Sequence, residues 1–130
     1  MESLSTKRDD LKRETRRVFT EREAEYLAEN MLGRIATVSL SMQPHVVPVT
    51  YRFDGSRIFF GGWKLPKSLK FRNIASNGRV AFVVDEVVST KPWRVRGVEV
   101  RGAAEPVTTE NGETIVKITP DKVRSWGISE

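Results

Sequence analysis

Residues 34–60 read RIATVSLSMQPHVVPVTYRFDGSRIFF, and the fold depends on how this stretch pairs. Along 34–40 apolar and polar side chains alternate with the two-residue period of a half-buried strand. A turn at 41–44 leads into a second strand over 45–53, and Asp54-Gly55 is a hairpin signal before a third strand at 57–60. The stretch therefore predicts three antiparallel strands in a meander.

Pro48 is unusual in the middle of the second strand, because proline has no N–H to donate to a neighbouring strand. We expect 45–53 to be an edge strand, to contain a bulge, or to face a ligand instead of a strand. In the last case Val47, Val49 and Thr50 would offer free backbone groups to a planar ligand. An edge strand without a ligand explains the proline equally well.

The segments on either side of the meander complete a small barrel. Thr20-Glu21-Arg22-Glu23 matches a capping box and predicts a helix to about Met31, ended by Gly33. Further elements are expected in this order: a helix over 67–76, a strand over 79–85 buried on both faces, a long strand over 93–107 with bends or bulges at Gly97 and Gly102, a strand over 113–119, and a polar tail over 120–130. Six antiparallel strands with two short helices predict a mainly β (α+β) barrel.

Length and composition favour one domain. The chain has 130 residues and 38% hydrophobic content, enough for a real core. We expect residues 1–18 to be a polar arm and 19–130 to be the barrel domain. Cysteine is absent, which excludes disulfides and thiolate metal sites, and no apolar run approaches the length of a membrane helix. The expectation is a soluble cytoplasmic protein with no membrane partner.

The segment Phe60-Gly61-Gly62-Trp63-Lys64-Leu65-Pro66-Lys67-Ser68-Leu69-Lys70 carries phosphate-binding chemistry. The N–H groups at a helix start have no intrahelical acceptors and lie at the positive end of the helix dipole. Lys67 and Lys70 add charge there, and Gly61 and Gly62 let a ligand approach the backbone. A solvated, lysine-rich loop before a surface helix is an equally good explanation of this segment alone.

Basic residues are concentrated near this segment, although the net charge is only +5. Between Lys64 and Arg101, lysine and arginine greatly outnumber the acidic residues Asp85, Glu86 and Glu99. A local anionic ligand explains this better than a diffuse polyanion, so we expect no nucleic-acid partner. The alternative is a basic nucleic-acid-binding barrel in which Trp63 and Trp93 are stacking platforms.

Several short motifs occur in a distinctive order. They are Gly33-Arg34-Ile35-Ala36-Thr37-Val38, Pro44-His45-Val46-Val47-Pro48-Val49, the lysine-serine helix start, Asn77-Gly78-Arg79-Val80-Ala81 and Arg96-Gly97-Val98-Glu99-Val100-Arg101-Gly102. Over about residues 20–127 this set resembles the pyridoxamine 5'-phosphate oxidase-like split β-barrel family. Lys91-Pro92-Trp93-Arg94 and Ser125-Trp126-Gly127 resemble most closely its deazaflavin (coenzyme F420)-dependent branch.

The resemblance implies a six-stranded antiparallel split barrel of the FMN-binding type, and a homodimer with flavin-type cofactors at the subunit interface. It implies that the strand His45 to Thr50, with Val47, Pro48 and Val49, lies along the cofactor ring. It further assigns Lys67, Ser68 and Lys70 to the phosphate, while Trp93 and Trp126 are expected as apolar walls.

Three departures from the oxidase pattern favour an exchangeable cofactor. The chain has Ser68-Leu69-Lys70 in place of Ser-Arg-Lys, His45 in place of a phosphate-binding arginine, and Gly61-Gly62-Trp63 in place of a hydroxyl-rich turn. We therefore expect hydride transfer between reduced coenzyme F420 and a small organic substrate. The alternative is an FMN-binding flavin reductase or pyridoxamine 5'-phosphate oxidase-like protein.

Other chemistries have less support in the sequence. Tyr51 and His45 are candidate proton donors, but an ordinary structural role explains each of them better. His45 is also the one imidazole available to a haem. A single histidine and no cysteine disfavour transition-metal sites, and a Gly-x-Ser-x-Gly elbow for a catalytic triad is missing.

Overall fold

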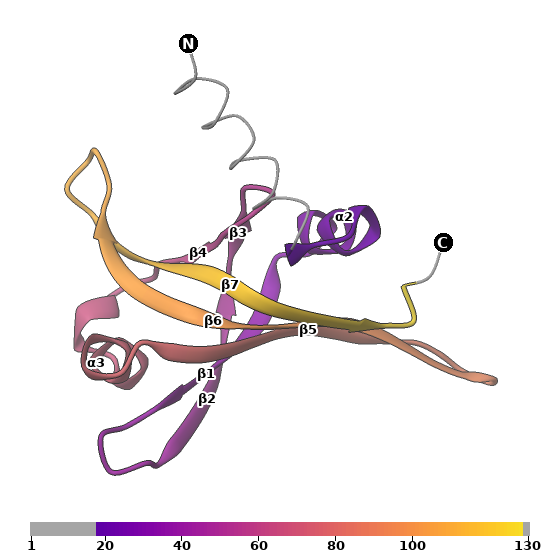
Figure 1. Cartoon of the computed structure of the whole chain (residues 1–130), viewed down its shortest axis with the longest axis horizontal. Coiled ribbons are helices and arrows are strands. Elements are labelled where there is room, and N and C mark those ends of the chain that lie inside the picture. Colours follow the sequence, from indigo (N-terminus) through magenta and orange to yellow (C-terminus); the bar gives the residue numbers. More distant parts are fainter. Residues whose placement is uncertain (1–17, 129–130) are drawn as a thin grey trace, which may run out of the picture.

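The computed structural model describes residues 18–128, which form one seven-stranded antiparallel sheet with two α-helices (Figure 1). The strand order is β2-β1-β5-β6-β7-β4-β3. The elements in chain order are α2 (Glu21–Glu29), β1 (Leu32–Val38), β2 (Pro44–Thr50), β3 (Arg52–Phe53), β4 (Ile58–Phe60), the 3-10 turn η1 (Leu65–Lys67), α3 (Leu69–Ser76), β5 (Arg79–Thr90), β6 (Trp93–Thr108) and β7 (Thr114–Trp126). This is the predicted mainly β split barrel, with seven strands where six were expected. The predicted arm lies almost wholly outside the described residues.

The sheet curls because its two edges are joined by one residue. β2 and β3 are the opposite edge strands, yet only Tyr51 separates them in sequence. Tyr51 is buried, and its N–H donates to the Met31 carbonyl at 2.9 Å. The predicted continuous strand over 45–53, and with it the three-stranded meander, was therefore wrong. The hairpin at Asp54-Gly55 is confirmed by the β3–β4 pair, and β2 is an edge strand, which is one of the three explanations that Pro48 left open.

The last three strands are longer than predicted. β5 continues to Thr90, and its first half alternates between buried and more exposed residues, so it is not buried on both faces. β7 continues to Trp126, where a polar tail was expected from residue 120, because it stays paired with β6 up to Gly97↔Trp126. Gly102 does lie at a register shift between β6 and β7, as its predicted bulge requires.

The core lies on the inner face of the curled sheet and is covered by the helices. Phe82, Ile35, Val98 and Ile118 are almost completely buried, and α3 packs against β1, β2 and β6. The capping box that opens α2 is confirmed by both of its hydrogen bonds. The helix ends at Glu29, earlier than predicted, and leaves Met31 69% exposed. Among residues 18–128, no helix is long and apolar enough to cross a membrane.

Candidate functional site

One pocket brings together two segments that the sequence pointed to separately. A cavity of about 240 Å³ lies where the end of β2 meets the end of β4. Thr50, from the predicted ring-binding strand, lines it together with Gly61 and Gly62, from the predicted phosphate segment. Its remaining lining residues are Tyr51, Arg52, Phe59, Phe60, Glu113 and Ile115. We call this cavity the β2–β4 pocket.

The two glycines shape this pocket in different ways. Gly62 has a φ of 139°, which residues with side chains rarely adopt, so its backbone path depends on glycine. At Gly61 a Cβ would lie 3.2 Å from Cγ2 of Ile115, which is a tight contact. Both positions beside the pocket therefore favour glycine over a residue with a side chain.

Lysines follow the glycine pair immediately. Lys64 adopts the left-handed conformation, and its ammonium lies 4.3 Å from the ring centre of Trp63. Trp63 is 87% exposed, so the structure places this ring at the surface. Buried Leu65 anchors η1, while Lys67 is exposed and Lys70 is partly buried in the first turn of α3. A helix start with two nearby lysines and without an acidic residue in its first turn suits an anion.

Ser68 is the N-cap of α3. Its hydroxyl donates to the Leu65 carbonyl at 2.6 Å and accepts the Phe71 N–H at 3.3 Å. The predicted phosphate contact from this hydroxyl would therefore compete with the cap. The main-chain N–H groups of Leu69 and Lys70 come first in the helix and have no intrahelical acceptors.

The predicted ring-binding strand presents two different faces. His45, Val47 and Val49 point toward the inner side of the sheet, whereas Pro48 and Thr50 are exposed on the outer side. His45 is thus on the opposite face from Thr50. Because β2 is an edge strand, it also has backbone groups that are directed away from β1.

The structure does not bring Trp93 or Trp126 to the β2–β4 pocket within one chain. Trp93 lies opposite Thr90 at the tip of the β5–β6 hairpin, which projects away from α3 and β4 (Figure 1). Trp126 lies opposite Gly97, and the β6–β7 register is regular there, so this glycine does not mark a bulge. Gly97 accommodates the ring of Trp126 instead, since a Cβ would lie 2.6 Å from its Cζ2 atom.

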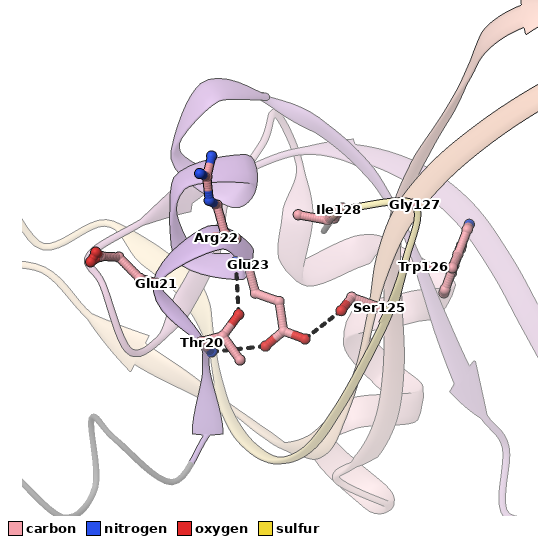
Figure 2. Close-up of a pocket in the computed structure, with 8 residues that line it drawn as sticks. All are labelled: Thr20, Glu21, Arg22, Glu23, Ser125, Trp126, Gly127 and Ile128. Carbon is pink, nitrogen blue, oxygen red and sulfur yellow. Dashed lines mark hydrogen bonds between the residues drawn. The ribbon is translucent and has the colours of Figure 1, made fainter. Parts of the chain in front are cut away.

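A second cavity, of about 530 Å³, shows what holds the C-terminal motif in place (Figure 2). The buried carboxylate of Glu23 accepts hydrogen bonds from the Thr20 N–H at 2.9 Å and from the Ser125 hydroxyl at 2.5 Å. Ser125 points toward Glu23, and the ring of Trp126 points to the other side of the strand (Figure 2). Ser125 therefore ties β7 to α2, and its neighbour faces outward.

The hydroxyl of Tyr51, a candidate proton donor, already makes a hydrogen bond within the fold. Its hydroxyl donates to the Leu27 carbonyl at 2.7 Å, and burial raises the pKa of the phenol. The proton is therefore held by the main chain of α2 and does not face the β2–β4 pocket as a free donor.

Sequence reasoning missed the arginines that face these cavities. Arg52 lines the β2–β4 pocket and contributes a guanidinium that the lysine segment does not. Arg34 lines a third cavity on the outer face of the sheet and pairs with Asp85. The alternation of 34–40 does place Arg34 on the face opposite Ile35, but the sequence does not indicate which strands lie beside it.

The chain belongs to the pyridoxamine 5'-phosphate oxidase family, whose model matches residues 19–127. A curated relative from Streptomyces rimosus, 5a,11a-dehydrotetracycline/5a,11a-dehydrooxytetracycline reductase, is 40% identical over 119 residues, covering 85% of this chain and 84% of that protein. The resemblance inferred from the ordered motifs is thereby confirmed at the level of the family.

Solved structures show the same fold. A conserved hypothetical protein from Mycobacterium tuberculosis aligns with a TM-score of 0.71 at 24% identity, covering 85% of this chain and 86% of that chain. An FAD-binding protein from Mycobacterium smegmatis aligns with a TM-score of 0.66 at 19% identity, covering 83% and 94%. A protein described as an F420 reductase aligns with a TM-score of 0.60 at 25% identity, covering 77% and 94%.

Proposed function

We propose that the protein is an oxidoreductase that transfers a hydride from reduced coenzyme F420 to a small unsaturated organic substrate. The observation that carries this proposal is the meeting of Thr50 with Gly61 and Gly62 in one pocket, directly before a lysine-flanked helix start. A ring along β2 and a phosphate at α3 would be adjacent in this arrangement. The relative named as a reductase and the structural neighbour named as an F420 reductase support the same reading.

The cofactor would supply the hydride, and the residues of the chain would bind and orient the cofactor. Lys67, Lys70 and the first N–H groups of α3 bind the phosphate, while the outward edge of β2 from Val47 to Thr50 holds the ring. Gly61 and Gly62 allow the ligand to approach the backbone between these two ends. Ser68 orients the helix start through its cap and does not need to donate to the phosphate.

The second part of this proposal is a homodimer with the site at the subunit interface. Trp93 is 65% exposed and Val88 51% exposed on a hairpin that extends beyond the body of the molecule (Figure 1). On the outer face of the sheet, Leu32 and Val46 are 59% and 61% exposed. Exposed apolar surface of this kind marks contact surfaces. A partner seated there would bring its Trp93 toward the pocket of the first subunit as an apolar wall.

The test is a titration of the purified protein with coenzyme F420 and, separately, with FMN, followed by tryptophan fluorescence. We expect F420 to bind, and Lys67→Ala/Lys70→Ala to weaken it by about tenfold to a hundredfold, which corresponds to about 1.4 kcal/mol per tenfold. Lys122→Ala is the matched control, because Lys122 is an exposed lysine on β7 and is not part of the start of α3. Tight FMN binding without F420 binding would replace the proposal with the FMN-dependent alternative.

Turnover is the second readout. Reduced F420 should be reoxidised in the presence of a cyclic enone, because hydride addition to a conjugated C=C bond fits a reductase of a dehydro compound. Failure with a panel of enones and quinones, despite F420 binding, would contradict the proposed direction of the reaction.

A further inference from the structure

A cleft on the outer face of the sheet lies beside the proposed cofactor strand. It has a volume of about 420 Å³ and is formed by four strands, β1, β5, β6 and β7. Its lining residues are Arg34, Asp85, Glu86, Val87, Val95 and Trp126. We call it the Arg34–Trp126 cleft. It shares no lining residue with the β2–β4 pocket.

One wall of the cleft is an aromatic platform. The ring of Trp126 lies on the backbone of β6, because Gly97 has no side chain to hold it off. Trp126 remains 38% exposed, and the cross-strand pair Val87 and Val95 adds apolar surface that is 53% and 37% exposed. A flat aromatic ligand would bury this surface and stack on the indole.

The opposite wall offers paired polar groups. Nη2 of Arg34 lies 2.5 Å from Oδ1 of Asp85, and their side chains are 50% and 36% exposed. A guanidinium has five N–H donors, and a carboxylate has two acceptor oxygens, so both keep capacity for a ligand. The carboxylate of Glu86 is occupied by Nε of Arg96 at 2.7 Å. A pair without net charge suits a neutral ligand whose edge carries both a carbonyl and a hydroxyl group.

The cleft is one strand away from the proposed ring site. Arg34 on β1 is the register partner of Pro48 on β2, and both side chains are on the outer face. Cα atoms of paired antiparallel residues lie about 4.5–5.5 Å apart. A ring held along β2 and a ligand held against Arg34 would therefore be neighbours. This step rests on the proposed function.

We propose that the Arg34–Trp126 cleft binds the substrate, and that the substrate is a flat fused-ring compound with neighbouring carbonyl and hydroxyl oxygens. Hydride from the reduced cofactor forms a C–H bond at the far carbon of a C=C bond conjugated to that carbonyl. The π electron pair moves to the carbonyl oxygen, the cofactor is oxidised, and water then supplies a proton to the remaining carbon. Arg34 donates to the oxygen that gains charge. Trp126, expected from the sequence as a cofactor wall, is assigned to the substrate instead.

The experiment uses 1,8-dihydroxyanthraquinone, a flat keto-phenol, as the probe for the protein without cofactor, with its visible absorbance change as the readout. We expect Arg34→Gln and Trp126→Ala each to weaken probe binding by about tenfold or more, in line with one lost charged hydrogen bond or aromatic contact. Arg79→Gln is the matched control, because Arg79 forms another exposed pair, with Asp121 at 3.0 Å. It should bind the probe like the unmodified chain.

A fluorescence arm places the probe independently. In the double variant Trp63→Phe/Trp93→Phe, Trp126 is the remaining indole, and the probe should still quench its emission. Arg34→Lys, which keeps the charge but not the planar fork, should bind the probe with intermediate affinity and should melt at the same temperature as the unmodified chain.

The outcomes separate this inference from the proposed function. F420 binding together with probe affinity that is insensitive to Arg34 and Trp126 would overturn the cleft assignment and leave the cofactor proposal standing. Arg34-dependent probe binding without F420 binding would do the reverse. One-for-one displacement of the probe by F420 would show that the cleft belongs to the cofactor, and would overturn its assignment to the substrate.

Discussion

The two ends of the curled sheet are built differently. At the closed end, β2 and β3 meet at Tyr51, and the rings of Tyr51 and Phe82 pack edge to face with centroids 5.2 Å apart. At the other end, the β5–β6 hairpin extends beyond the core, and Val87, Val88 and Trp93 are more than half exposed. The first end has the packing of a core, while the second is apolar surface that no other part of residues 18–128 covers. The difference indicates that one end supports the fold and the other is available for binding.

Phe82→Ala should have the largest effect on stability. The side chain is 1% exposed, and its ring fills the space over Gly33, where a Cβ would lie 2.3 Å from Cζ of Phe82. Truncation leaves a cavity and should lower the free energy of unfolding by about 3–5 kcal/mol. Urea denaturation measures it, with Val87→Ala in the hairpin as the control, expected within about 0.5 kcal/mol of the unmodified chain. Equal losses of unfolding free energy in the two variants would contradict the view that only the closed end has the packing of a core.

Two buried tyrosines allow a matched comparison of hydroxyl groups. The Tyr51 hydroxyl donates to the Leu27 carbonyl, whereas the buried hydroxyl of Tyr26 has the Glu86 carboxylate nearby but makes no hydrogen bond of good geometry within residues 18–128. Tyr51→Phe leaves a buried carbonyl without its donor and should cost about 1–3 kcal/mol. Tyr26→Phe should change the free energy of unfolding much less. A larger loss for Tyr26→Phe would contradict the hydrogen-bond assignment.

Tyr26 also predicts a pH dependence where α2 meets the hairpin. Burial, and then the nearby charge of Glu86, raise its pKa from 10.0 to about 12. The unfolded chain therefore releases this proton at a lower pH than the folded chain does. The stabilisation is complete below pH 10 and is lost as the pH rises toward 12. Stability measured between pH 9 and 12 should fall less steeply in Tyr26→Phe than in the unmodified chain, and identical slopes would refute the assignment.

Trp93→Ala, at the hairpin tip, should have the smallest effect on folding. Its ring is 65% exposed, so the free energy of unfolding of the single chain should change by about 0.5 kcal/mol or less. Association should weaken instead, and analytical ultracentrifugation should show more monomer at a given concentration. An unchanged assembly state would remove the hairpin tip from the proposed interface.

Features that depend on neighbouring residues could be predicted from the sequence. The capping box at Thr20 and the hairpin at Asp54-Gly55 follow from local geometry, and the missing N–H group of Pro48 limited its strand to a few positions, of which the edge is the observed one. The meeting of Gly61 and Gly62 with Thr50 was not predicted directly, because the resemblance implied only that their two segments contact one cofactor.

The predictions that were wrong concern strands whose limits depend on pairing with segments far away in the sequence. The break at Tyr51 arises because β2 pairs with β1 while β3 pairs with β4, and the alternation is continuous across both. β7 runs past residue 120 because β6 provides a partner for it there, although its own side chains are polar. The Arg34–Trp126 cleft joins four strands whose order only the structure gives.

The proposal that both subunits contribute to each cofactor site is tested most directly by mixing two altered subunits. One subunit carries Lys67→Ala/Lys70→Ala at the helix start, and its partner carries Trp93→Ala at the hairpin tip. If each cofactor site combines the pocket of one subunit with the hairpin of the other, the mixed dimer contains one intact site. We predict that F420 binds with unmodified affinity at one of the two sites of each mixed dimer, which is about a quarter of all sites in an equimolar mixture with random subunit exchange, although both parents bind weakly. Binding no tighter than that of either parent would contradict the account.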